Sequence, residues 1–145
     1  MIPDSLWLDI LGNVPIVCAD CAIVRGGKAL LILRGDQPAK GEWWVPGGRV
    51  LKGETLRQAA RRKAMGEVGL DCWVGPPVHY AETIFDDGPG GVPVHSVNTC
   101  FLLWPKGQGQ EVLLDPSIVK SCWVESAGEL LLHPYVTACL RGAGL

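Results

Sequence analysis

A glycine-rich turn that leads into a charged helix is the part of this chain best suited to chemistry. The turn reads Pro-Gly-Gly and ends at Gly48, and Glu54, Arg62 and Glu67 follow it. Glycine leaves backbone carbonyls and amides open to a ligand, and a helix that starts at such a loop holds its side chains at a fixed distance below it. Because Glu54 and Arg62 are eight residues apart, the arginine can lie under the loop and pair with the glutamate. We therefore expect a ligand-binding loop braced by an ion pair.

Local patterns predict the elements that position this loop. Residues 54–68 are rich in Arg, Ala, Gln and Lys and predict a helix, with Thr55 as its cap and Gly69 as its stop. Apolar and β-branched runs predict strands at 15–24, 29–34, 43–45, 78–85, 92–104 and 121–124. One or two short helices are expected at 129–140, around Pro134. Strands on both sides of one strong helix indicate an α/β fold with a mixed sheet and helices on its faces.

Length and charge exclude several functional classes. A chain of 145 residues is typical of one domain, here 1–145. Lys and Arg number 13 against 15 Asp and Glu, without a basic cluster, which argues against nucleic acid as a partner. No apolar run reaches the roughly 18 residues that span a bilayer, and the N-terminus lacks the basic region of a signal peptide. We expect a cytoplasmic protein with no membrane partner, in which Cys18 and Cys21 are buried structural thiols.

The segment from Gly48 to Leu70 resembles the signature of the Nudix hydrolases, G-x5-E-x7-R-E-U-x-E-E-x-G-U, where U is a bulky aliphatic residue. Six residues fall on this pattern in register: Gly48, Glu54, Arg62, Glu67, Gly69 and Leu70. The resemblance implies an α/β/α sandwich with a central mixed sheet, and a hydrolase that uses Mg²⁺ or Mn²⁺. Lys63 and Gly66, however, stand where the family has glutamates. With two of the usual carboxylates absent, the segment can hold at most one metal ion loosely.

The same segment, with residues upstream from Pro15, is similar to the GDP-mannose mannosyl hydrolases, an atypical Nudix branch that also lacks those acids. This resemblance implies a nucleoside diphosphate sugar as substrate, with water attacking the anomeric carbon so that a C–O bond breaks. It assigns Mg²⁺ to the Gly47 carbonyl and Glu67, the diphosphate to Arg34 and Arg49, and the sugar to Asp20. These roles suit a leaving group that gathers negative charge. Of the two adjacent tryptophans on their strand, Trp44 is the candidate for stacking on the nucleobase, with core packing as the alternative.

The general base of that branch is missing here. The branch has a Gln-His pair in the loop before the last Trp-containing strand, where this chain has Ser117 and Ile118. Asp115 is the nearest carboxylate in that loop, and it either reaches the metal or forms a turn before Pro116. The three histidines of the chain, His79, His95 and His133, lie elsewhere and are expected to be surface or structural residues.

Three functions are consistent with the sequence. The first is a Mg²⁺-dependent hydrolase of nucleoside diphosphate sugars or related nucleoside diphosphate derivatives. The second is a catalytically silent Nudix domain that binds a nucleotide, and the third is an ordinary Nudix pyrophosphohydrolase. The N-terminal apolar segment at 6–11 is expected to dock either on a second subunit, forming a homodimer, or on its own domain.

Overall fold

A mixed sheet of seven strands forms the centre of the computed structural model, which describes residues 1–145. The strands follow the order β3-β2-β1-β6-β5, with β4 added beside β1 and β7 beside β2. Their bounds are β1 Ile16–Arg25, β2 Lys28–Arg34, β3 Trp43–Trp44, β4 Gly47–Arg49, β5 Cys72–Phe85, β6 Val94–Pro105 and β7 Ile118–Val124. β1 runs parallel to β6, and every other pairing is antiparallel. The expected mixed sheet is therefore confirmed.

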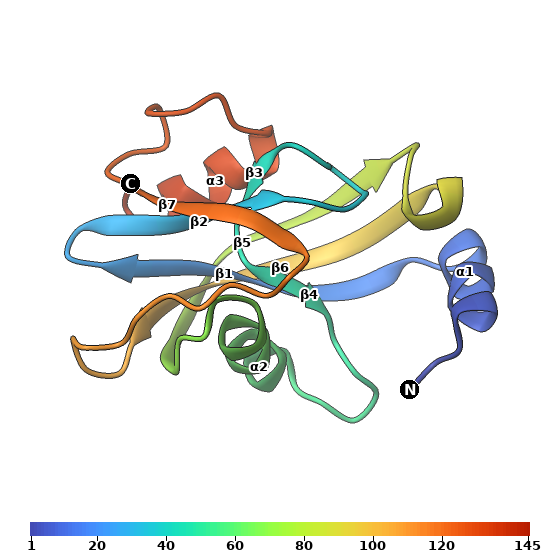
Figure 1. Cartoon of the computed structure of the whole chain (residues 1–145), viewed down its shortest axis with the longest axis horizontal. Coiled ribbons are helices and arrows are strands. Elements are labelled where there is room, and N and C mark those ends of the chain that lie inside the picture. The colour runs from blue at the N-terminus through green and yellow to red at the C-terminus, as the bar shows by residue number, and fades with distance from the viewer.

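Helices cover the two sides of this sheet. Figure 1 shows α2 (Leu56–Val68) on one side of the strands and α3 (Pro134–Gly142) on the other, which is the predicted α/β/α sandwich. A third helix, α1 (Asp4–Asn13), lies at the end of the sheet beside the start of β1. A short 3-10 turn, η1 (Pro89–Gly91), interrupts the connection between β5 and β6.

Both ends of α2 are fixed by the residues that the sequence singled out. The Thr55 hydroxyl accepts a hydrogen bond from the Gln58 amide at 3.1 Å, and the Gln58 side chain accepts one from the Thr55 amide at 2.9 Å. This reciprocal capping box starts the helix at Leu56, two residues later than predicted. Gly69 ends it in the left-handed conformation, with φ of 70°, which costs glycine little.

Several element predictions need correction. Gly47 and Gly48, which were expected in a turn, lie in strand β4 and pair with β1. β7 begins at Ile118 rather than at residue 121. β5 begins at Cys72 rather than at residue 78, because its pairing with β6 continues through register shifts around Pro77. Residues 129–133 are not helical, and the single C-terminal helix starts at Pro134, whose fixed φ suits the first helical position. The apolar N-terminal segment forms α1, which was not predicted as a helix.

Most of the core lies between the sheet and α2 or α3. Ala59, Ala60, Ala64 and Val68 form the buried face of α2. All six cysteines are free thiols, and the Cys21 thiol donates a hydrogen bond to the Ala60 carbonyl at 3.2 Å. Cys21 is buried as expected, but Cys18 is only partly buried, because it lines a cavity on the opposite face of β1.

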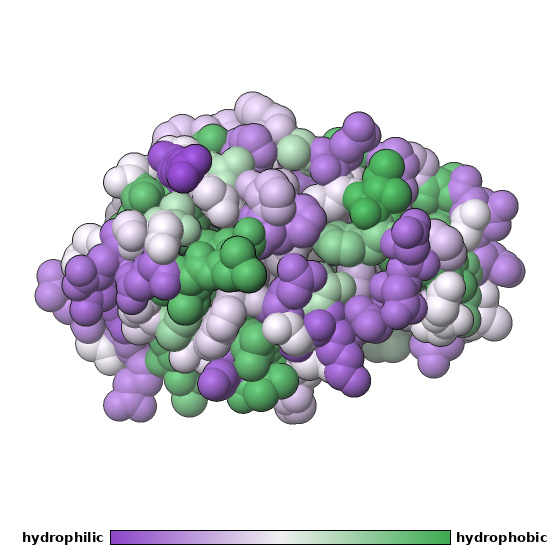
Figure 2. Space-filling view, turned by 90° about the horizontal axis from the view of Figure 1, so that it is seen from above, coloured by the Kyte–Doolittle hydropathy of each residue, from purple (hydrophilic) through white to green (hydrophobic).

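The surface carries no extended apolar face in the view from above. Figure 2 shows hydrophobic patches as separate islands among hydrophilic residues. None of the three helices is long and apolar enough to cross a membrane.

Candidate active site

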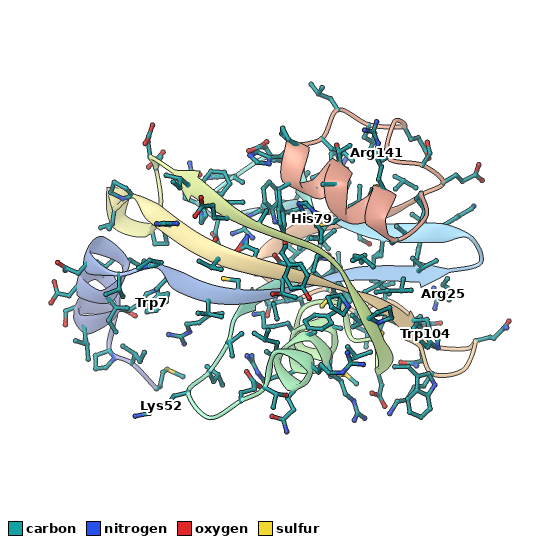
Figure 3. All side chains as sticks on the ribbon, turned by 180° about the vertical axis from the view of Figure 1, so that it is seen from behind. Trp7, Arg25, Lys52, His79, Trp104 and Arg141 are labelled. Atoms are coloured by element: carbon teal, nitrogen blue, oxygen red, sulfur yellow. The ribbon has the colours of Figure 1, made fainter.

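A cavity of about 270 Å³ opens on the side of the sheet that faces away from α2. Its wall comes from α1, β1, the 37–39 loop and the 44–49 segment, and its floor from β5 and β6. Strand register explains the floor, because Cys18 pairs with Asn98 and Thr83 pairs with Ser96. Paired residues in adjacent strands point to the same face, so these side chains share the cavity. Figure 3 shows Trp7 of α1, which lines the cavity, at one end of the molecule, and Trp104 and Arg25 at the opposite end.

Asp20 is the carboxylic residue that lines this cavity. It is 6% exposed, and its Oδ2 accepts a hydrogen bond of 2.6 Å from the hydroxyl of Tyr135 on α3. Burial raises the pKa of Asp20 to about 7, and the Tyr135 hydrogen bond opposes this rise. The cavity therefore contains a carboxyl group that exchanges its proton near neutral pH.

Two arginines line the cavity without a carboxylate partner. The Arg34 Nε donates to the Pro38 carbonyl at 2.6 Å, and the Arg49 guanidinium lies 4.3 Å above the centre of the Trp7 ring. Neither arginine takes part in any of the five ion pairs of the chain. Two guanidinium groups whose charge is not balanced by a carboxylate suit an anionic ligand with several oxygens.

Glu67 does not line the cavity, but it is joined to Gly47, which does, where β4 passes α2. The Gly47 amide donates a hydrogen bond of 2.8 Å to the Glu67 Oε1. Burial raises the pKa of Glu67, and the nearby Lys63 ammonium and this hydrogen bond lower it again. A side chain at position 47 would collide with the carboxylate of Asp20, so the close approach of these strands requires glycine.

The fit of this site to a divalent cation depends on its donors. No three His, Cys, Asp or Glu side chains gather into a metal-binding cluster. Glu67 keeps one carboxylate oxygen free of the Gly47 hydrogen bond, and the Gly47 carbonyl is the second donor that the family resemblance assigns. Mg²⁺ is commonly held by one or two carboxylates together with substrate phosphates and water. These residues therefore fit a cation that is shared with a bound diphosphate.

Lys63 lies over the glycine turn. A Cβ on Gly48 would lie 2.6 Å from the Lys63 Cε and 3.0 Å from its Nζ, so the lysine chain runs directly across this glycine. Its ammonium forms none of the five ion pairs and lowers the pKa of both Asp20 and Glu67. The site therefore includes a third cation beside the two arginines.

Glu54 and Arg62 connect the loop to α2. The Arg62 Nε and Nη2 donate to the two carboxylate oxygens of Glu54 at 2.7 and 2.9 Å. The same Nη2 donates to the Arg49 carbonyl at 3.0 Å, and Glu54 accepts from the Leu51 amide at 3.1 Å. The arginine side chain is 39% exposed and that of the glutamate 15%, so the brace is near the solvent.

Trp44 is 7% exposed and forms part of the cavity wall. Its ring centre lies 5.8 Å from that of Phe85, 5.0 Å from that of His133 and 5.9 Å from that of Tyr135. Trp43, on the opposite face of β3, is partly buried beneath the ammonium of Lys120. Trp44 thus packs in the core and also forms part of the cavity wall.

No histidine lines the cavity. His133 caps α3 by accepting a hydrogen bond from the Tyr135 amide, and His95 pairs with Glu82 at 3.1 Å. Asp115 accepts hydrogen bonds from the amide and hydroxyl of Ser117, so it forms the turn that was one of its two expected roles. These hydrogen bonds lower the pKa of Asp115.

The sequence did not reveal several residues that line the cavity or contact its lining. Tyr135 reaches Asp20 from 115 positions away. Thr83, Ser96 and Asn98 come together only through the pairing of β5 with β6. One local signal was present, because Ser96 and Asn98 are two residues apart on β6, which is the spacing of residues on one face of a sheet.

The chain is an α/β/α sandwich in which two arginines line a cavity beside a braced glycine loop. Comparison with known proteins identifies the family: the NUDIX domain profile matches residues 15–135, and the chain belongs to this family.

Relatives and solved structures agree with this assignment. The low-salt glycan biosynthesis protein Agl8 of Haloferax volcanii is 37% identical over 137 residues, covering 93% of this chain and 86% of that protein. An ADP-ribose pyrophosphatase of Methanocaldococcus jannaschii is 43% identical over 56 residues, covering 39% of this chain and 33% of that protein. The MutT NUDIX hydrolase from Burkholderia pseudomallei superposes with a TM-score of 0.74 and 25% identity, over 90% of this chain and 98% of that one. Nudix hydrolases generally use divalent metals such as Mg²⁺.

Proposed function

We propose that this Nudix chain hydrolyses a nucleoside diphosphate sugar, or a related nucleoside diphosphate derivative. The observation that carries the proposal is the pair of arginines, Arg34 and Arg49, which line one cavity and lack carboxylate partners. A diphosphate offers several charged oxygens to such a pair, and two fixed guanidinium groups stabilise the charge that collects on it as it leaves.

The residues around the cavity divide the work of such a reaction. Arg34 and Arg49 bind and orient the diphosphate, and Asp20 holds the sugar and is the group able to accept or return a proton near neutral pH. Glu67 and the Gly47 carbonyl would hold Mg²⁺ or Mn²⁺, which supplies further charge stabilisation to the leaving diphosphate. Trp44 presents an aromatic surface to the ligand.

The names of the relatives support this substrate class. One is a glycan biosynthesis protein, which matches nearly the whole chain, and another is a pyrophosphatase of ADP-ribose, itself a nucleoside diphosphate derivative of a sugar.

An N-terminal homodimer belongs to the proposal as well. Between α1 and the 49–56 segment lies a separate cavity of about 870 Å³, lined mainly by hydrophobic residues, where a second copy would find apolar surface. Size-exclusion chromatography with light scattering tests it, and a monomer at all concentrations would exclude it.

The deciding experiment is a substrate panel with product identification. GDP-mannose, UDP-glucose and ADP-ribose are incubated with the protein and Mg²⁺ or Mn²⁺, and products are separated by chromatography. We expect hydrolysis of at least one, with free sugar and a nucleoside diphosphate as products, and its loss in Arg49→Gln. Monophosphate products would instead indicate an ordinary Nudix pyrophosphohydrolase. Absence of turnover across the panel would overturn the proposal.

One observation favours a second candidate, a Nudix domain that binds a nucleotide without hydrolysing it. The cavity lacks a histidine base, and Lys63 occupies a position where the family carries a glutamate. In the same panel this candidate predicts a higher melting temperature with ligand but no product, because a ligand that binds only the folded state stabilises it.

A further inference from the structure

The cavity floor contains a group of buried polar side chains that the proposed reaction does not use. Thr83 on β5 and Ser96 and Asn98 on β6 are 6%, 8% and 4% exposed. All three line the cavity next to Asp20, since the pairing of β1, β6 and β5 points their side chains to the same face. We call Thr83, Ser96 and Asn98 the polar floor.

Hydrogen bonding within the polar floor is incomplete. The Thr83 and Ser96 hydroxyls are 2.7 Å apart, and the Asn98 amide nitrogen donates weakly to the Thr83 hydroxyl at 3.4 Å. The Asn98 Oδ1 has no partner, and it is the one buried side-chain polar atom of the chain in this condition. An unsatisfied buried acceptor costs about 1–3 kcal/mol, so its persistence at a cavity indicates that a bound molecule completes it.

The chemistry of the floor indicates what that molecule carries. The two hydroxyl groups and the asparagine amide of the polar floor can donate as well as accept hydrogen bonds. Sugar hydroxyls can do the same, so the two sets of groups are complementary. The cavity volume, about 270 Å³, is slightly below the range of about 300–1,000 Å³ usual for whole ligands, so it suits one ring rather than an entire nucleotide sugar. The arginines at the same cavity then take the diphosphate.

We propose that the polar floor is the sugar-binding subsite, in which the Asn98 Oδ1 accepts a hydrogen bond from a hydroxyl of the ligand's sugar. This inference rests on the proposed function, because it names the part of the same ligand that enters the cavity. Asn98 is a specificity-determining residue in this arrangement. It distinguishes a nucleoside diphosphate that carries a sugar from one that does not.

The test compares each sugar nucleotide with its sugar-free counterpart. Dissociation constants for GDP-mannose and GDP, and for UDP-glucose and UDP, are measured by calorimetry, with KM replacing them wherever hydrolysis occurs. Asn98→Leu keeps the branched shape of the side chain and replaces its polar atoms, including the acceptor, with carbon. We expect it to weaken the sugar nucleotide about five- to tenfold, the value of one hydrogen bond, and to change the nucleoside diphosphate less than about twofold.

Two further variants make the result decisive. Thr99→Val removes a buried hydroxyl from the opposite face of β6 and should change neither constant, since Thr99 pairs with Ala19 and does not line the cavity. Ser96→Ala, a smaller change, provides the same comparison if Asn98→Leu fails to fold. Equal weakening of both ligands, or no weakening of the sugar nucleotide, would overturn the polar floor as a sugar subsite and leave the proposed function standing. Failure of the wild-type protein to bind any of the four would overturn both.

Discussion

Replacing Glu54 with glutamine tests the brace that holds the glycine loop. The change keeps the shape of the side chain but removes the charge that receives two hydrogen bonds from Arg62, at 2.7 and 2.9 Å. It also weakens the acceptor for the Leu51 amide. Of the two contacts that Arg62 of α2 makes with the loop, the change weakens the one to Glu54 and leaves the hydrogen bond to the Arg49 carbonyl.

The exposure of the pair sets the size of the effect. Breaking one side of a buried ion pair costs about 3–5 kcal/mol, whereas an exposed pair contributes about 0–1 kcal/mol. The Glu54 side chain is 15% exposed and that of Arg62 39%, and the paired geometry is bidentate. We therefore expect a loss of about 1–2 kcal/mol, which lowers the melting temperature of a domain of this size by about 3–6 °C.

Thermal unfolding by circular dichroism measures this loss against a matched control. Glu125→Gln removes the same charge from the Lys28–Glu125 pair, whose atoms are 3.8 Å apart and whose side chains are 48% and 75% exposed. The control should shift the melting temperature by less than about 1 °C. Equal melting temperatures for the two variants would show that the Glu54–Arg62 pair does not brace the loop.

Three other predictions follow from neighbouring features. Hydrogen bonds from Arg62 lower the pKa of Glu54 below the ordinary 4.5. The free energy of unfolding that wild type gains over Glu54→Gln should therefore be complete above about pH 4.5 and disappear as the pH falls through the lowered pKa. Urea unfolding of both proteins between about pH 3 and pH 7 measures this difference. Lys63→Ala should tighten Mg²⁺ binding about two- to tenfold in calorimetry with GDP, because it removes a cation that competes for the Glu67 carboxylate. Lys28→Ala is the control and should leave the affinity unchanged. Equal Mg²⁺ affinities for wild type and Lys63→Ala would show that Lys63 does not reach the metal. Gly66→Ala should stabilise α2 by about 0.5–1 kcal/mol, since a Cβ meets open space there. Gly69→Ala should destabilise the helix by about 1 kcal/mol or more, because Gly69 has a φ of 70°. A higher melting temperature for Gly69→Ala than for Gly66→Ala would contradict this.

Local patterns were sufficient to predict the elements around the loop. The capping residue Thr55 and the stop at Gly69 are determined by hydrogen bonds and backbone angles within a few residues, so the helix could be predicted almost to its ends. The Gly26-Gly27 turn of the first hairpin has φ values of 60° and 75°, which glycine adopts readily. The α1 helix lacked such signals, because neither a side-chain cap nor a glycine stop marks its ends.

The cavity depended on contacts that no local pattern contains. The family resemblance pointed to Asp20, but nothing in the sequence indicated that Tyr135 is its hydrogen-bond partner. Asn98 faces the cavity only because β6 runs parallel to β1 and antiparallel to β5, a pairing that the sequence leaves open. Residues that are brought together by strand register are therefore the part of such a site for which a structure is needed.

Arg49 is held from two directions before any ligand arrives. Its guanidinium rests on the Trp7 ring, and its carbonyl accepts a hydrogen bond from Arg62. An unrestrained arginine side chain would lose conformational entropy worth up to about 2 kcal/mol on binding a diphosphate. The side chain of Arg49 has already lost part of this freedom on folding. Under the proposed function, the N-terminal helix would therefore preorganise Arg49 for binding the diphosphate. A change that detaches α1 would weaken ligand binding through the added disorder of Arg49, even though the chemistry of the cavity stays the same.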